Sequence, residues 1–435
     1  MILTVKPVRS LKGQAQLPSS KSYTIRAFLI ASCGGESILI NPSDCDDAKA
    51  AMVIARCLGA KIHYKKGNVW HVKTKGQQPR MSVMNVGESG TVLRLLLPML
   101  ARQPGYFLVR GEGTLAGRPN THLIQALRAM GVTIEGQDPN ESVPISLIGG
   151  GLKGGKLEIE GSLSSQFISA FLITCPQLKE DTHLVITGEK IVSVDYVTMT
   201  EQVLKLAGIQ MQRLSAREFK IFGNQQFKGL KNFTIPADYG LTGFLMAAAA
   251  LIKSNVVFFG NLNDHFVQAD GAILKFLQDM GVKFTKTKQA IKLQGPFALK
   301  GGDFSLKNCP DLLPIMAVLA LFADGKTRLY DIEHARAKES DRISDLRKEL
   351  LKIGARIAEK KNELTIDPQP AYKKNIHFDP HHDHRLAMAF CILGLKIGAT
   401  IDDIECIRKS YPRFVRDLRK IGGKMKKSEK KLNSV

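Results

Sequence analysis

Apolar and polar positions follow a pattern that returns six times along the chain. Each copy has an amphipathic helical stretch that ends in a hydrophobic residue and a glycine, followed by a short strand of alternating polarity. The glycines are separated by 72, 77, 73, 73 and 68 residues, so the sequence contains six copies of one unit. A glycine in this place is the usual left-handed cap of a helix. The six glycines are Gly59, Gly131, Gly208, Gly281, Gly354 and Gly422.

A second landmark precedes each amphipathic stretch. A short group of small or polar residues opens a helix that is apolar on nearly all sides, as in 244–252 and 312–322. Such a helix is buried, so each unit is expected to hold a buried helix, a strand, an amphipathic helix and further strands. Because a helix N-terminus presents unpaired N–H groups, several of them facing one way would bind phosphate. The six openings are residues 18–22, 87–91, 162–166, 236–240, 308–311 and 381–384.

The composition is that of an ordinary globular protein. The chain has 435 residues, of which 44% are hydrophobic and 23% charged, and we expect two or three domains. No apolar run reaches the roughly 18–20 residues that a membrane span needs, and the first residues show no basic leader. The seven cysteines form no Cys-x-x-Cys pair and are odd in number, which favours buried thiols over disulfides or a zinc site. We therefore expect a cytoplasmic protein with no membrane partner.

The net charge of +22 favours an anionic partner. A nucleic-acid-binding chain would concentrate its basic residues and interleave aromatic ones. Here only 424–431 is a true basic run, and Trp70 is the single tryptophan. A small polyanionic substrate fits this dispersed charge better than a nucleic acid does. The lysine-rich tail after Gly423 is expected to fray.

Basic residues that could bind an anionic ligand lie at or near the first openings. Lys21 and Ser22 begin the first predicted buried helix, and Arg26 lies four residues after Ser22 on the same face. In 87–94, two glycines allow a ligand close to the backbone, and an arginine follows one turn later. Arg118 stands just before a proline that can start a helix. Each segment alone could equally be a capped helix end or a surface loop.

The carboxylates lie in the last two repeats. Asp311 is at a predicted helix start, and 338–342 places a lysine and an arginine one helical turn apart with a glutamate between them. That spacing alone also suits an exposed helix with salt bridges. The histidine-rich run 381–385 could bind a metal. It has no cysteine partner and opens a helix in register with the other five, so we expect no metal there.

Together these segments resemble the 5-enolpyruvylshikimate-3-phosphate synthase family over essentially the whole chain. The resemblance implies an α/β (α+β) fold: a two-lobed inside-out α/β barrel in which each lobe has three repeated β-α-β-α-β-β units. It places residues 1–18 and 236–435 in lobe I and residues 19–235 in lobe II. It also implies an active site in the cleft between the lobes.

The activity that the resemblance implies is transfer of the enolpyruvyl group of phosphoenolpyruvate to the 5-hydroxyl of shikimate 3-phosphate. Phosphate would leave by addition and elimination through a tetrahedral intermediate. This is the shikimate-pathway step toward chorismate and the aromatic amino acids, and the family is the glyphosate target. The resemblance implies no cofactor and no metal, and we expect a monomer that binds neither nucleic acid nor membrane.

Site residues follow from the resemblance, position by position. Catalysis is assigned to Asp311 as the base and Glu339 as the proton donor, with Lys21 and Lys338. The residues implied to bind shikimate 3-phosphate are Lys21, Ser22, Arg26, Ser164, Ser165, Gln166, Ser193, Asp311, His334 and Lys338. The residues implied to bind phosphoenolpyruvate are Lys21, Gly90, Arg118, Gln166, Arg342, Arg385 and Lys409.

The glycine-rich opening departs from the family pattern. The family commonly has asparagine, alanine and proline where this chain has Glu88, Ser89 and Leu95. Glu88 adds negative charge near a predicted anion site, and we expect a cation such as Arg118 to offset it.

Two other functions would explain part of the sequence. UDP-N-acetylglucosamine enolpyruvyl transferases share the implied fold, but they normally carry a cysteine in the loop that is 111–117 here and an asparagine where this chain has Ser22. Neither is present. A non-catalytic polyanion-binding protein would explain the charge and the repeats, but it would not need Asp311 and Glu339 among its cations.

Overall fold

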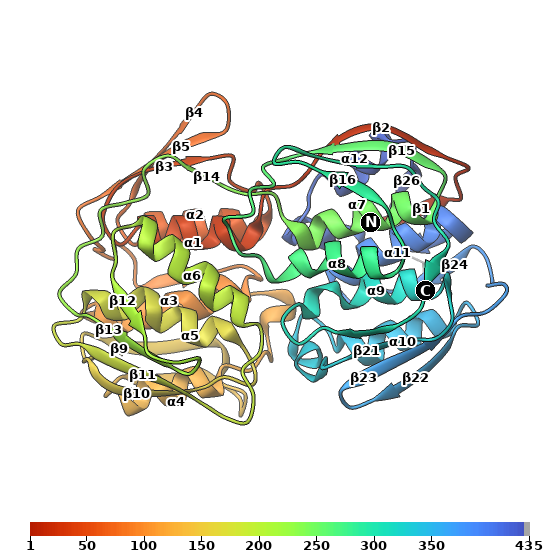
Figure 1. The fold of residues 1–435 in the computed structure, drawn as a ribbon. Coiled ribbons are helices and arrows are strands. Elements are labelled where there is room, and N and C mark those ends of the chain that lie inside the picture. The colour runs from red at the N-terminus through yellow and green to blue at the C-terminus, as the bar shows by residue number, and fades with distance from the viewer. Residues whose placement is uncertain (430–435) are drawn as a thin grey trace. The chain divides into compact units, whose positions relative to one another are not determined.

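A computed structural model describes residues 1–429. The chain forms two compact units and passes between them twice (Figure 1). Unit 1 contains Met1–Pro18 and the chain from Ala237 onward, and unit 2 is the continuous segment Ser19–Pro236.

Six buried helices form the interior of the units, three in each, and each begins at one of the six openings. Their apolar sequences leave no face suited to water, which is why they lie inside while the sheets lie around them. In unit 2, α3 packs against α1 and α5, and in unit 1 the three helices pack on one another (Figure 1). They are α1 (Lys21–Ala31), α3 (Gly90–Arg102), α5 (Ser165–Thr174), α7 (Tyr239–Leu251), α9 (Leu313–Ala320) and α11 (His384–Ile397).

Six amphipathic helices end at the repeated glycines. All six glycines have φ between +83° and +110°, the left-handed conformation expected of a helix cap, so this prediction is confirmed. The helices are α2 (Asp46–Cys57), α4 (Thr121–Ala129), α6 (Val194–Leu206), α8 (Ala272–Asp279), α10 (Arg342–Leu351) and α12 (Phe414–Lys420). The short 3-10 helices are η1 (Gly113–Leu115), η2 (Cys175–Gln177), η3 (Ala269–Gly271), η4 (Pro310–Leu312), η5 (Glu333–Ala337) and η6 (Ile404–Lys409).

Three four-stranded sheets in unit 2 share one design. In each, the first two strands are parallel and the next two pairings are antiparallel. The first is β14 (Phe233–Thr234), β3 (Gly35–Ile40), β5 (Val69–Thr74) and β4 (Lys61–Lys65). The second is β6 (Val83–Asn85), β7 (Gly105–Arg110), β9 (Ser142–Gly149) and β8 (Thr133–Gln137). The third is β10 (Gly155–Glu160), β11 (Thr182–Thr187), β13 (Glu218–Ile221) and β12 (Met211–Arg213).

Unit 1 repeats the same design three times. Its first sheet is β2 (Leu11–Gln16), β15 (Ser254–Phe259), β17 (Ala290–Leu293) and β16 (Phe284–Lys286). The second is β19 (Asp303–Ser305), β21 (Thr327–Tyr330), β23 (Glu363–Asp367) and β22 (Arg356–Lys360). The third is β24 (Ile376–Phe378), β25 (Ala399–Ile401), β1 (Ile2–Lys6) and β26 (Lys424–Ser428). A two-stranded ribbon joins β18 (Leu299–Lys300) to β20 (Ala323–Asp324).

Two strands pair in the unit other than the one that holds the helix directly after them. β2 comes directly before α1 of unit 2, yet it pairs with β15 in unit 1. β14 comes directly before α7 of unit 1, yet it pairs with β3 in unit 2. In addition, β1 takes the third place in the last sheet, where Leu3 lies opposite both Ile401 and Lys427. Unit 1 is therefore completed by the first residues of the chain.

The expectation of a frayed tail was wrong for the part that the structure describes. Residues Lys424–Ser428 form β26, which pairs with β1 along its whole length, because β1 offers a continuous edge of backbone donors and acceptors. Residues 430–435 lie outside the described part of the chain. Within residues 1–429, no helix has both the length and the apolar character needed to cross a bilayer. The seven cysteines are free thiols.

Candidate active site

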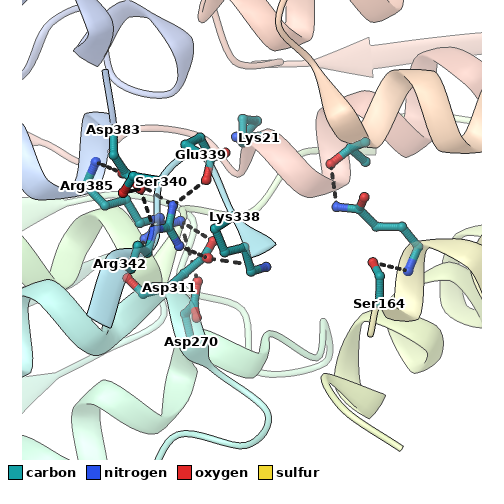
Figure 2. Close-up of polar contacts among 12 residues, drawn as sticks. Lys21, Ser164, Asp270, Asp311, Lys338, Glu339, Ser340, Arg342, Asp383 and Arg385 are labelled. Atoms are coloured by element: carbon teal, nitrogen blue, oxygen red, sulfur yellow. Dashed lines mark hydrogen bonds and ion pairs between the residues drawn. The ribbon is translucent and has the colours of Figure 1, made fainter. Parts of the chain in front are cut away.

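Arg342 is the centre of a charge cluster in unit 1. It is the first residue of α10, and none of its side chain is exposed. Its Nε, Nη1 and Nη2 donate to Asp383, Asp311 and Glu339 respectively, each at 2.6 Å (Figure 2). Burial disfavours the charged form, but the three carboxylates hold the pKa of Arg342 well above its usual range. One guanidinium thus fixes three carboxylates in place.

Asp311 lies in η4, just before α9, and contacts three cations. Its Oδ2 is 2.9 Å from Nη2 of Arg385, and its Oδ1 is 3.7 Å from Nζ of Lys338 and 2.6 Å from Nη1 of Arg342. About a fifth of its side chain, 21%, is exposed. Burial and the charge of Glu339 would raise the pKa of Asp311, but the three cations outweigh both and hold it well below the usual range. Asp311 is therefore ionised at neutral pH.

Arg385 brings the N-termini of the buried helices of unit 1 together. It is the second residue of α11, and besides Asp311 it approaches the buried Asp270, with Nη2 and Oδ2 3.8 Å apart. At Gly240, the second residue of α7, a Cβ would collide with the Asp270 carboxylate and lie 3.0 Å from Nη1 of Arg385. Only glycine lets the start of α7 approach this ion pair so closely.

Asp383 ties the start of α11 to Arg342. Its Oδ1 accepts the N–H of Arg385 at 2.8 Å, which is an N-cap bond, and its Oδ2 accepts from Arg342. The two preceding histidines have left-handed backbones, with φ of +51° at His381 and +58° at His382. They pair with separate carboxylates: His382 with Asp403, and His381 mainly with the buried Glu349. Residues 1–429 contain no group of three or more histidine, cysteine or acidic side chains suited to a metal ion.

In unit 2, Lys21 and Arg26 lie on the first turns of α1. Nζ of Lys21 is 2.9 Å from Oδ2 of Asp47, and both side chains are mostly buried. Arg26 is 1% exposed and donates to the hydroxyl of Thr200 at 2.8 Å and to the main-chain oxygens of Ser22 and Tyr196 at 3.1 and 3.3 Å. These three acceptors are uncharged, and burial lowers the pKa of Arg26 to about 10. A guanidinium in such surroundings gains from an added anion.

A side-chain network joins the N-termini of α3 and α5. The amide of Gln166 donates to Oγ1 of Thr91 at 2.9 Å and accepts from Nη1 of Arg94 at 2.8 Å. Ser89 and Ser164 cap these helices with neutral hydroxyls, so the caps add no negative charge to the helix ends (Figure 2 shows the Ser164 cap). In unit 1 the caps of α7 and α11 are instead the carboxylates of Asp238 and Asp383. Of the two units, the helix ends of unit 2 are thus the more favourable for an anion.

Arg118 lies against the first residue of α3. A Cβ at Gly90 would be 3.1 Å from Nη1, 3.2 Å from Cζ and 3.4 Å from Nη2 of Arg118, so the guanidinium rests on the glycine. Arg94 donates to the Pro119 oxygen at 3.0 Å and to the side chain of Asn120 at 3.2 Å, next to Arg118 in the chain. The sequence predicts no site role for Arg94, and the structure adds it to this network. Its position one turn inside the glycine-rich opening is the signal that points to such a role.

The remaining predicted residues lie at the start of α5, before α6 and in two 3-10 helices. Ser165 begins α5, and Ser193 precedes α6 in a left-handed conformation with φ of +55°. His334 is buried in η5, which packs against η4, and Lys409 is buried at the end of η6, which packs against α11. In unit 1 the contacts bring together Asp311, Lys338, Glu339, Arg342 and Arg385.

Comparisons with known proteins agree over almost the whole length. The family model described as EPSP synthase (3-phosphoshikimate 1-carboxyvinyltransferase) matches residues 5–418. A 3-phosphoshikimate 1-carboxyvinyltransferase of Methanocaldococcus jannaschii is 35% identical over 426 residues, covering 97% of this chain and 98% of that protein. The enzyme of the same name from Methanosarcina acetivorans is 36% identical over 424 residues, covering 96% and 97%.

Solved structures support the fold. EPSP synthase from Acinetobacter baumannii superposes with a TM-score of 0.80 at 24% identity, covering 98% of this chain and 100% of that one. The enolpyruvyl transferase NikO from Streptomyces tendae gives a TM-score of 0.78 at 19% identity, covering 98% of both chains. The expected two-lobed inside-out α/β architecture is thereby confirmed. With the family model and the two relatives spanning nearly all of its residues, this chain belongs to the EPSP synthase family.

Proposed function

We propose that this protein transfers the enolpyruvyl group of phosphoenolpyruvate to the 5-hydroxyl of shikimate 3-phosphate and releases phosphate. The observation that carries the proposal is the arrangement around Arg342, where Asp311 and Glu339 are held on one buried guanidinium at 2.6 Å each. The reaction needs one group that takes a proton from the hydroxyl and another that gives a proton to the methylene carbon. Asp311, which is ionised, is the group that takes a proton, and Glu339 in its protonated form is the group that gives one.

Anion binding uses two sets of cations. For shikimate 3-phosphate we propose Lys21, Arg26 and Lys338, with the polar residues of the helix ends: Ser22, Ser164, Ser165, Gln166, Ser193, Asp311 and His334. For phosphoenolpyruvate we propose Lys21, Gly90, Arg118, Gln166, Arg342, Arg385 and Lys409. Planar arginine side chains match carboxylate and phosphate groups, and several fixed cations offset the mutual repulsion of two anionic substrates.

Asp311 becomes a better base as the substrates bind. Its pKa lies well below the usual range because Arg385, Lys338 and Arg342 surround it, and a carboxylate so stabilised accepts protons weakly. When these cations share their charge with substrate carboxylate and phosphate, their hold on Asp311 weakens and its pKa rises. The binding of the anions thus activates the base that removes the hydroxyl proton.

Glu339 is the proposed proton donor. It lies three residues before Arg342 and shares that guanidinium with Asp311, which keeps the two carboxylates close to each other. Protonation of the methylene carbon allows the hydroxyl oxygen to bond to the neighbouring carbon of phosphoenolpyruvate. The tetrahedral adduct then loses phosphate and one proton of its new methyl group, which returns to the Glu339 carboxylate, and the double bond is restored. Lys21 and Lys338 stabilise the negative charge on the reacting groups.

The test is phosphate release by the purified protein. Phosphoenolpyruvate would be supplied with shikimate 3-phosphate in one reaction and with UDP-N-acetylglucosamine in a parallel one, and the products identified by mass spectrometry. We expect release and enolpyruvyl transfer only with shikimate 3-phosphate. Release only with the nucleotide sugar would assign the chain to the other activity, and release with neither would contradict both.

We also propose that the protein works as a monomer in the cytoplasm. The cluster around Arg342 is completed by residues of one chain, and seven free thiols suit a reducing compartment. Light scattering after size exclusion would test the oligomeric state, and a mass near twice the 47.9 kDa of the chain would contradict it.

A further inference from the structure

Glu88 fastens the loop that carries Arg118. It lies in the turn just before α3, and its side chain reaches Thr114 in the connection between β7 and α4, residues 111–120. Oε2 of Glu88 accepts from both the main-chain N–H and the hydroxyl of Thr114, each at 3.2 Å. A carboxylate beside a site proposed for anions is costly unless it has another use, and these bonds indicate that use.

The loop passes so close to Glu88 that it needs glycine. Gly113 has φ of +54°, which L side chains rarely adopt, and a Cβ there would lie 2.5 Å from Cδ and 2.6 Å from Oε2 of Glu88. The loop backbone therefore packs directly on the carboxylate. This contact is independent of the two hydrogen bonds, and it indicates that the loop is shaped around a side chain of this length.

A second set of hydrogen bonds holds the base of the same loop. Asn85 accepts the N–H of Gly87 at 2.8 Å and donates to Oε1 of Glu112 at 2.6 Å, while the N–H of Glu112 donates to the Gly87 oxygen at 2.9 Å. After Glu112 the chain forms two successive turns. They are closed by main-chain hydrogen bonds from Leu115 N–H to the Glu112 oxygen at 3.1 Å and from Arg118 N–H to the Leu115 oxygen at 3.3 Å. The path from Thr114 to Arg118 is short and is supported by these main-chain hydrogen bonds.

The Arg118 side chain has little room to move on the side of α3. Its guanidinium would stand only 3.1–3.4 Å from a Cβ at Gly90, so it is in close contact with the start of α3. A small shift of the loop would move the guanidinium away from the helix N-terminus, where its charge adds to the partial positive charge of the helix.

We propose that Glu88 is a positioning residue, which sets the place of Arg118 by clamping Thr114 and thereby governs affinity for phosphoenolpyruvate. The inference rests on the proposed function, in which Arg118 binds that substrate. Glu88 acts through the loop and not on the reacting atoms. Its loss should therefore raise KM for phosphoenolpyruvate and leave kcat and KM for shikimate 3-phosphate nearly unchanged.

Two variants separate the clamp from the charge. In Glu88→Ala both the clamp and the negative charge are lost, whereas in Glu88→Gln the charge is lost but an oxygen acceptor of the same reach remains. If the charge alone mattered, both variants would lower KM for phosphoenolpyruvate by removing repulsion. If the clamp matters, only alanine raises KM, and Thr114→Val, which keeps the N–H but loses the hydroxyl, raises it less.

The experiment combines kinetics with hydrogen exchange. For Glu88→Ala we expect KM for phosphoenolpyruvate to rise roughly five- to thirtyfold, as loss of hydrogen bonds to a charged group suggests. Amide exchange in the peptide containing Thr114 should become faster in that variant, and both readouts should return close to wild type in Glu88→Gln. The matched control is Glu158→Ala, an exposed carboxylate on β10 that pairs with Lys156 and should change neither readout.

The outcomes are distinct. An unchanged or lowered KM in Glu88→Ala, or unchanged exchange at Thr114, would overturn the positioning role. If the wild-type chain released no phosphate with shikimate 3-phosphate, the proposed function would fail. Calorimetric binding of phosphoenolpyruvate and the exchange rates would then still decide whether Glu88 sets the anion affinity of this loop.

Discussion

Replacing Asp311 with asparagine should separate substrate binding from turnover. Asp311 competes with the substrates for Arg342, Arg385 and Lys338, to which it lies within 2.6, 2.9 and 3.7 Å. In Asp311→Asn the shape and one oxygen acceptor remain, while the proposed base and its charge are lost. We therefore expect a chain that binds phosphoenolpyruvate at least as well as wild type and hardly turns it over.

The magnitudes follow from the surroundings. Loss of a positioned general base lowers kcat by about 10²–10⁴-fold. Two like charges about 6 Å apart repel by about 3 kcal/mol at an effective dielectric constant of about 20. Because a fifth of the Asp311 side chain is exposed, solvent screening leaves about 1 kcal/mol, equivalent to about fivefold tighter binding of phosphoenolpyruvate.

The same substitution should change how stability depends on pH. Because the folded-state pKa of Asp311 is depressed, its ionised form contributes stability above the unfolded pKa of about 3.9, and this contribution is lost as pH falls through the folded pKa. At neutral pH the free energy of unfolding of Asp311→Asn should be lower by about 1–2 kcal/mol, because Arg342 keeps two carboxylates and Arg385 keeps Asp270. Below about pH 4 the difference from wild type should narrow.

The assays are single-turnover phosphate release, calorimetric titration with phosphoenolpyruvate, and urea unfolding at a series of pH values. A kcat within about tenfold of wild type would refute the role of Asp311 as base, since base catalysis contributes about 10² or more. Much weaker binding of phosphoenolpyruvate would refute the argument that Asp311 competes for the cations. A stability difference that widens toward acid pH would contradict the sign of the pKa shift.

Three further substitutions test other parts of the site. Lys21→Met should lower kcat by about 10²–10³-fold, and a near-normal kcat would count against its proposed role. Gly90→Ala should push the Arg118 guanidinium away from α3 and raise KM for phosphoenolpyruvate more than KM for shikimate 3-phosphate; equal effects would contradict the contact. Asp383→Asn should lower the free energy of unfolding by about 1–3 kcal/mol in urea titrations, because Arg342 would lose one charged partner, and unchanged stability would refute that pairing.

The repeats were predictable because each is a local pattern. Gly59 and Gly354 mark helix ends through a backbone conformation that favours glycine, and the apolar run 244–252 requires burial wherever it lies. The openings could likewise be identified because small and polar residues cap helices. Such signals depend only on residues within a few positions of one another. The structure contains a helix at each of the six openings.

Pairing between distant segments could not be predicted in the same way. β2 directly precedes the first repeat in the sequence, but nothing local distinguishes a strand that pairs with β3 from one that pairs with β15. The charge patterns of 338–342 also suited an exposed salt-bridged helix. The burial of Arg342 and its three carboxylate partners depend on segments far apart in the chain, which sequence spacing does not bring together.

The position of β1 also governs how the chain can fold during its synthesis. Its neighbours in the sheet, β25 and β26, are synthesised about 400 residues after it, since Leu3 lies opposite Ile401 and Lys427. At about 5–20 residues per second, the first strand waits about 20–90 s for its partners, with its apolar face uncovered. Unit 2 is continuous and can close meanwhile, but unit 1 can close only after β26 has been synthesised. A prematurely terminated product would therefore carry a foldable unit 2 between an unpaired N-terminal strand and an incomplete unit 1, a species suited to capture by chaperones and proteases.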